Sequence, residues 1–225
     1  MLPRFRPAAF GLFAVIWFVS MLLGDRPWAV ELALDPDAFA RFEGLWQPLT
    51  AMLFQPVGRG ALAGTLLVLW VCASPLEGFW GMRRYLLMVL VSGFVGYVGT
   101  GLLALAVPII AASAPIGSAL PIELATVVAF GFVFSDTPYR PFGMDRPIRG
   151  RWVALVLGLL LAGVPFINGQ LWYPLIPASM SALVAVLFVT QPWRRQGKSG
   201  KIDAKKPRDR PSHLRLVHSA EDMLN

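Results

Sequence analysis

The chain has 225 residues, of which 56% are hydrophobic and only 15% are charged, and its formal net charge at pH 7 is +7. This length accommodates several packed helices and a polar tail, but it excludes a large soluble domain beside them. The composition therefore predicts one membrane domain, residues 1–193, and one basic tail, residues 194–225, that is largely disordered. The single cysteine, Cys72, excludes an intramolecular disulfide.

Long uncharged runs predict six membrane-spanning helices. The segment from Trp152 to Trp193 carries no charged residue, and it is about twice the roughly 20 residues that one helix needs to cross a bilayer. Proline, asparagine and glycine between Pro165 and Gln170 divide it into two spans. Backbone groups in lipid must pair with one another, so we expect helices. The predicted spans are residues 8–24, 60–80, 85–107, 116–135, 152–166 and 171–191.

The loop charges predict that both termini lie in the cytoplasm, and we expect a multi-pass protein of a bacterial inner membrane. Basic residues collect on the cytoplasmic side of a membrane. Of the 20 lysines and arginines, this orientation leaves only Arg26, Arg41 and Arg59 outside. The basic tail then meets anionic lipid or a cytoplasmic protein. We do not expect it to bind nucleic acid, because it lacks interleaved aromatic residues.

The loop between the first two predicted spans, residues 25–59, is long for a compact helical protein. Asp35 begins a short helical pattern, and aromatic residues such as Trp28 and Phe39 stand among polar ones. We predict one or two short helices that lie flat in the headgroup region at the outer face. An ordinary extracellular loop that packs its aromatic residues onto the bundle is the alternative.

Two motifs flank the second predicted span. The first loop contains Trp46-Gln47-Pro48-Leu49-Thr50, and the span ends in Glu77-Gly78-Phe79-Trp80-Gly81-Met82-Arg83-Arg84. Together with six spans, they resemble the rhomboid family of intramembrane serine proteases over about residues 8–191. The family patterns are W-R-x-x-T and E-x-x-x-G-x-x-R, and Gln47 stands where the family has arginine. The resemblance implies an all-α, six-helix polytopic bundle with a long interfacial first loop. The matching residues are Trp46, Thr50, Glu77, Gly81 and Arg84.

Glu77 lies at a predicted membrane boundary. Its carboxylate can pair with Arg83 or Arg84, or it can accept backbone hydrogen bonds. A simple boundary ion pair would contribute little. We expect a structural role in which Glu77 fixes the turn between the second and third spans.

The resemblance also implies a catalytic site, which the sequence does not supply. Rhomboid proteases use a serine in a G-x-S-G motif at the start of the fourth span, and a histidine in the sixth span is its general base. Here the matching segment offers Ser118, and the histidine position falls near Ile176. The only histidines, His213 and His218, lie in the tail. A serine without a base is a poor nucleophile. We therefore assign no catalytic residue, and Ser118 would be the nucleophile only in an active enzyme.

A candidate intramembrane polar site comprises Ser118, Glu123 and Ser179. Glu123 lies about 9 Å below the outer end of the fourth helix, at 1.5 Å per residue, and ionisable residues inside a membrane are functional candidates. We expect it to bond a hydroxyl such as that of Thr126, or to offer a polar feature to a client helix or water. No metal or cofactor is expected.

Small residues predict close helix packing, since they let helices approach in lipid. They are Gly60 and Gly64 in the second span, Gly93, Gly96 and Gly99 in the third, and Ala178, Ser179, Ser181 and Ala182 in the sixth.

Three functional hypotheses follow. The first is a rhomboid-like pseudoprotease that binds transmembrane segments of client membrane proteins and affects their stability or trafficking. The second is a divergent rhomboid endopeptidase that uses Ser118. The third is a non-catalytic structural subunit of a membrane complex.

Overall fold

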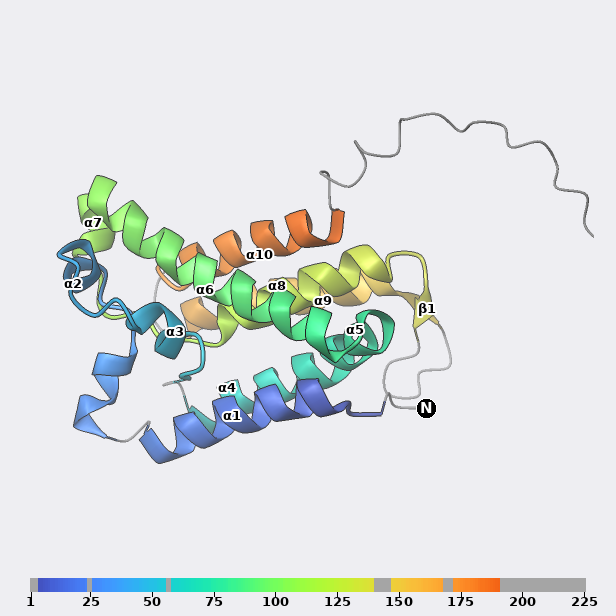
Figure 1. Cartoon of the computed structure of the whole chain (residues 1–225). Helices are drawn as coiled ribbons and strands as arrows, with labels where there is room; N and C mark the ends of the chain where they lie inside the picture. The colour runs from blue at the N-terminus through green and yellow to red at the C-terminus, as the bar shows by residue number, and fades with distance from the viewer. Residues whose placement is uncertain (1–3, 24–25, 56–57, 140–146, 168–171, 191–225) are drawn as a thin grey trace, which may run out of the picture. The chain divides into compact units, whose positions relative to one another are not determined.

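The computed structural model describes residues 4–23, 26–55, 58–139, 147–167 and 172–190, so the predicted basic tail lies outside the described residues. Helices dominate this part of the chain (Figure 1). The longer ones are α1 (Pro7–Leu23), α4 (Gly58–Val68), α6 (Met82–Ala106), α8 (Leu120–Val133), α9 (Gly150–Ile167) and α10 (Leu175–Thr190). The shorter elements are the helices η1 (Pro27–Leu32), α2 (Pro36–Ala40), α3 (Gln47–Ala51), η2 (Leu69–Ala73), α5 (Ser74–Trp80) and α7 (Pro108–Ala111), and the antiparallel strands β1 (Pro138–Tyr139) and β2 (Ile148–Arg149).

Two helices of the described chain are long and apolar enough to cross a membrane. They are Ala61–Trp80, with a mean hydropathy of 1.6, and Met82–Ala106, with a mean hydropathy of 2.0. Four shorter apolar helices lie at the other predicted positions: Pro7–Leu22, Leu120–Val133, Gly150–Phe166 and Leu175–Thr190. A helix thus occupies each of the six predicted apolar ranges.

The start of α8 differs from the prediction. We expected this helix to begin at residue 116, but it begins at Leu120. The reason is that Ile116 forms an isolated antiparallel bridge with Leu34 of the first loop. The two backbones exchange hydrogen bonds of 2.9 and 2.7 Å. Extended backbone of this kind cannot also be helical.

The helix α8 occupies the centre of the packing. It contacts α4, η2, α5, α6, α9 and α10. Its side chains Ile122, Val127 and Phe130 are almost fully buried. Ser118 and Glu123 lie just before this helix and in it, so their surroundings are set by its neighbours.

The helices α6 and α10 pack closely because glycine and serine stand at their contact. A Cβ atom on Gly96 would clash with the carbonyl oxygen of Pro177 and with the hydroxyl of Ser181. The Ser181 hydroxyl donates a hydrogen bond of 2.6 Å to the carbonyl of Ser92. Gly99 lies against Met180 in the same way. The close helix packing predicted from small residues is therefore confirmed at Gly96 and Gly99.

The other predicted glycine contacts differ. Gly93 lies against Ile122 of α8 and Met52 of the first loop. A Cβ atom on Gly64 would have no neighbour within 4 Å, so the expected close approach of a second helix is wrong there. Gly60 lies outside the residues whose surroundings the structure describes.

Glu77 has a structural role, but not the one we expected. The side chain is 4% exposed, and its Oε2 atom accepts hydrogen bonds from the backbone N–H groups of Ala8 (3.1 Å) and Ala9 (3.0 Å). The carboxylate thus caps the first turn of α1, where helix N–H groups have no partner within the helix. The turn between α5 and α6 is made by Gly81 instead, whose φ of +80° suits a glycine.

Arg84, the last residue of the second motif, contacts aromatic rings. Its guanidinium carbon lies 5.4 Å from the ring centroid of Trp80 and 5.6 Å from that of Phe188. Both distances fall within the range of cation–π attraction. Arg84 therefore joins α5, α6 and α10. Its guanidinium contacts aromatic rings, whereas one expectation was an ion pair with Glu77.

The first loop contains three short helices, η1, α2 and α3, where we expected one or two. The Asp35 side chain caps α2 by accepting hydrogen bonds from the N–H groups of Asp37 (3.1 Å) and Ala38 (3.3 Å), as the helical pattern at Asp35 predicts. Part of the loop packs inward, since Phe54 is buried. Trp46, by contrast, is 63% exposed. The inward packing agrees with the second interpretation at Phe54, and the placement of the loop in the headgroup region stays a prediction.

The middle of the helix Ala61–Trp80 is a π-helical stretch, η2. The hydroxyl of Tyr139 in β1 donates a hydrogen bond of 3.3 Å to the carbonyl of Val71 in this stretch. Burial raises the pKa of Tyr139 to about 12, so the hydroxyl keeps its proton at neutral pH. The contact holds the β1–β2 hairpin against η2.

Gly96 gives a test of the α6–α10 contact. Gly96→Ala adds a methyl group against the backbone of α10, and overpacking of this kind costs about 1–3 kcal/mol. We expect a clear fall in the melting temperature of the purified protein. Gly64→Ala is the matched control, because its methyl group enters open space and alanine favours the helix by roughly 0.5–1 kcal/mol. Equal destabilisation by the two substitutions would contradict the packing described above.

Glu77 gives a test of the cap on α1. Glu77→Ala leaves two backbone N–H groups without their acceptor, and we expect a loss of about 1–3 kcal/mol in stability. Glu77→Gln keeps an acceptor oxygen and should lose less. Thermal unfolding measures both, with Glu31→Ala at an exposed glutamate as the control. Equal stability of the Glu77→Ala and Glu31→Ala proteins would contradict the structural role of Glu77.

Candidate functional site

Ser118 lies in the segment just before α8, and it is 9% exposed. Its Oγ atom donates a hydrogen bond of 3.0 Å to Oε1 of Gln55. The same oxygen accepts a hydrogen bond of 3.0 Å from the N–H of Leu120, the first residue of α8. The hydroxyl therefore accepts the first N–H of α8, which has no partner within the helix, and its one proton is held by a side-chain amide.

Gln55 is the residue of this site that sequence reasoning missed. Its Oε1 atom also accepts a hydrogen bond of 2.7 Å from the backbone N–H of Ala119. The backbone N–H of Gln55 donates a hydrogen bond of 3.0 Å to the hydroxyl of Ser20. A polar residue between Phe54 and a proline in an apolar stretch was the available signal. That signal identifies a buried amide, but it does not reveal a partner more than sixty positions away.

The backbone of Ser118 is also fully engaged. Its N–H donates to the hydroxyl of Tyr97 (2.8 Å) and to the carbonyl of Ala51 (3.1 Å). The Tyr97 hydroxyl in turn donates to the carbonyl of Ser118 (2.7 Å). Tyr97 is fully buried in α6. The backbone N–H groups of Ser118 and Ala119 thus already have acceptors within the protein.

This arrangement does not activate a nucleophile. A serine attacks a peptide only when a nearby base takes its proton. The two partners of the Ser118 hydroxyl are an amide oxygen and a backbone N–H, and neither takes up a proton at neutral pH. The N–H groups that could stabilise an oxyanion are directed at Gln55, Tyr97 and Ala51. The geometry supports a structural role for the Ser118 hydroxyl at the start of α8.

Glu123 is bound to a different helix than expected. Its carboxyl oxygen Oε1 is hydrogen-bonded to the hydroxyl of Thr65 in α4, whereas Thr126 donates to the carbonyl of Ile122 (2.9 Å). The Thr65 hydroxyl also lies 3.1 Å from the carbonyl of Ala61. Glu123 therefore joins α8 to α4.

The three residues of the candidate polar site do not share hydrogen bonds. Ser118 is bonded to Gln55, Glu123 to Thr65, and Ser179 to the carbonyl of Ile176 (2.9 Å) in its own helix. Ser179 is exposed on α10. Within the described ranges, no group of three or more His, Cys, Asp or Glu residues lies close enough to hold a metal ion.

A cavity of about 310 Å³ lies next to the segment before α8. Its lining is mostly apolar, and Ser118 is not part of it. The hydroxyl therefore does not face this space. The lining includes Ala33, Phe54, Ile116, Gly117, Tyr173 and Pro174.

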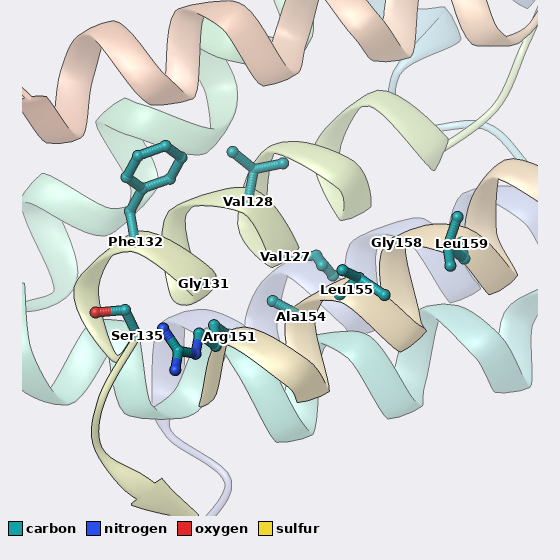
Figure 2. Close-up of a pocket in the computed structure, with 10 residues that line it drawn as sticks. All are labelled: Val127, Val128, Gly131, Phe132, Ser135, Arg151, Ala154, Leu155, Gly158 and Leu159. Carbon is teal, nitrogen blue, oxygen red and sulfur yellow. The ribbon is translucent and has the colours of Figure 1, made fainter. Parts of the chain in front are cut away.

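A larger groove of about 550 Å³ is lined by residues of α8 and α9 (Figure 2). Its residues are apolar along most of its length, and Ser135 and Arg151 stand together at one end. None of the hydrogen bonds of Ser118 or Glu123 involves a residue of this groove.

The bond between Gln55 and Ser118 is testable by a double-mutant cycle. Gln55→Ala leaves the Ser118 hydroxyl and the Ala119 N–H without their acceptor, so we expect it to be destabilising and coupled to Ser118→Ala by about 0.5–3 kcal/mol. Thermal unfolding of the two single variants and the double variant measures the coupling. Gln47→Ala is the control, because Gln47 accepts a hydrogen bond from Asp35 and should combine additively with Ser118→Ala. Additivity of Gln55→Ala with Ser118→Ala would contradict the site geometry.

Comparison with known proteins adds no relative to this picture. No protein-family model matches the chain, and no curated protein matches it significantly. The resemblance to rhomboid proteases therefore stays a prediction from the residues.

Proposed function

We propose that the chain is a rhomboid-like pseudoprotease that spans the membrane six times, with both termini in the cytoplasm. It binds transmembrane segments of client membrane proteins and affects their stability or trafficking. Six apolar helices at the predicted positions support the membrane placement. The distribution of arginine and lysine among the loops supports the orientation.

One observation carries the non-catalytic part of this proposal. The Ser118 hydroxyl is bonded to an amide and to a helix N-terminus, and the neighbouring N–H groups are bonded within the protein. An active protease would keep such donors open for the substrate carbonyl. These pairings support a scaffold in which the polar groups at the position of the protease site stabilise the fold and do not catalyse a reaction.

The exposed side of α9 supports client binding. Within the described residues this helix packs mainly against α8 and is joined to β2, and several of its large apolar side chains are exposed. Val156 and Leu160 are 53% and 62% exposed, and a Cβ atom on Gly163 would have no neighbour within 4 Å. These three residues are four and three positions apart, so they share one stripe. A glycine in open space allows a second helix to approach closely in lipid.

The loss of catalysis is tested with the purified chain in liposomes. A generic single-span substrate should remain uncleaved, and a serine-directed fluorophosphonate should not label the protein. Ser118→Ala should change neither result. Cleavage or labelling that Ser118→Ala abolishes would establish the divergent endopeptidase and overturn the proposal.

Client binding is tested by photo-crosslinking in the same liposomes. A photoreactive residue at Leu160 should capture a synthetic apolar single-span peptide several times more efficiently than one at Leu183 of α10, which is similarly exposed at 66%. Gly163→Leu should reduce capture at Leu160, because the added side chain keeps the peptide away. Equal capture at both positions, or no effect of Gly163→Leu, would contradict the α9 face as the binding surface.

A further inference from the structure

We propose that the groove between α8 and α9 binds one anionic phospholipid, whose phosphate contacts Arg151 and whose acyl chain lies between the two helices. This inference rests on the membrane placement proposed above. It does not depend on the loss of peptidase activity or on the client-binding face.

Small residues form the floor of the groove, where the two helices are closest, and large residues form its walls. A Cβ atom on Gly131 would lie 2.8 Å from Cβ of Ala154, so the two helices touch at this point. At Gly158 the neighbours on α8 are 3.9 Å or more from the position that a Cβ atom would take, so there is more room. Phe132 of α8 and Leu159 of α9 form exposed walls (Figure 2). A flexible hydrocarbon chain fits such an apolar furrow.

Arg151 lies at one end of the groove beside Ser135, whose hydroxyl donates a hydrogen bond of 3.2 Å to the exposed carboxylate of Asp136. The N–H of Arg151 donates a hydrogen bond of 3.3 Å to the carbonyl of Ser135, which holds these two residues together. The Arg151 guanidinium has five N–H donors, and its one ion pair within the described residues is a 3.8 Å contact with Asp136 whose side chains are 47% and 76% exposed. Such exposed pairs are weak. A phosphate oxygen is a better partner, because arginine binds phosphate with two parallel hydrogen bonds.

The length of the groove favours a lipid over a client helix. From Arg151 to Leu159 the groove follows α9 for about 12 Å, at 1.5 Å per residue. One leaflet of the hydrocarbon core is about 15 Å thick, half of the roughly 30 Å that a spanning helix must cover. A groove that begins with a cation at the headgroup level and ends within one leaflet matches a single lipid molecule.

The headgroup contact is tested by native mass spectrometry of the full chain in detergent with added phosphatidylglycerol or phosphatidylcholine. We expect the protein to bind phosphatidylglycerol about tenfold more tightly, as a ratio of dissociation constants. Arg151→Gln should reduce this preference to threefold or less. Arg83→Gln removes the same charge from an exposed position at the start of α6 and should leave the preference unchanged. Equal effects of the two substitutions would show a general surface attraction and overturn the proposal.

The acyl contact is tested by filling the groove. Gly158→Leu should weaken binding of both lipids severalfold, whereas Gly163→Leu, on the client-binding face of the same helix, should not. Unchanged lipid binding in Gly158→Leu would overturn the proposal, and so would a single-span peptide that displaces the lipid and is itself blocked by Gly158→Leu. Loss of peptide capture at Leu160 with lipid binding intact would count against the proposed function alone.

Discussion

The hydrogen bonds of the Gln55 amide are the constraint on which the rest of the structure depends. One oxygen atom accepts from the Ser118 hydroxyl and from the N–H of Ala119, and the backbone of the same residue donates to Ser20. These contacts connect the end of α1, the first loop and the start of α8. Tyr97 adds α6 to the same point through both backbone groups of Ser118.

In apolar surroundings such hydrogen bonds determine how the helices are positioned relative to one another. A buried amide or hydroxyl without a partner costs several kcal/mol, so each partner fixes where its helix can lie. Glu77 fixes α1 against α5, and Glu123 fixes α8 against α4, in the same manner. The Ser118 hydroxyl belongs to this set. Its proton is donated to Gln55 and its oxygen accepts the N–H of Leu120, so the hydroxyl is held in the packing of α8 and is not activated for attack.

The sequence predicted the helices better than the contacts between them. Uncharged runs locate helices because every residue of such a run contributes to the signal, and the six ranges overlap α1, α4 to α5, α6, α8, α9 and α10. The predicted start of α8 is too early, since hydrophobicity does not distinguish the extended backbone at Ile116 from helix. Glu77 was correctly expected to be structural, but the motif spacing directs attention to nearby arginines and not to Ala8, which is distant in sequence.

The candidate site was the least predictable part for the same reason. The absence of a histidine near Ile176 is visible in the sequence, and it predicts a serine without a base. What replaces the base is not visible, because Gln55 lies in the first loop and Ser118 precedes α8. Thr65 carries no signal of its own in the sequence, because its bond to Glu123 depends on how α4 rotates against α8.

The π-helical stretch η2 sets which directions the side chains on either side of it face in the helix Ala61–Trp80. A π-helical turn contains one residue more than an α-helical turn, and each residue of an α-helix turns the chain by about 100°. The extra residue therefore lets Thr65, before η2, face α8 while Glu77, after η2, faces the start of α1. A homologue that is one residue shorter between Leu69 and Ala73 would present only one of these two side chains to its partner. The length of this short segment is thus as strongly constrained as the identity of the residues on either side of it.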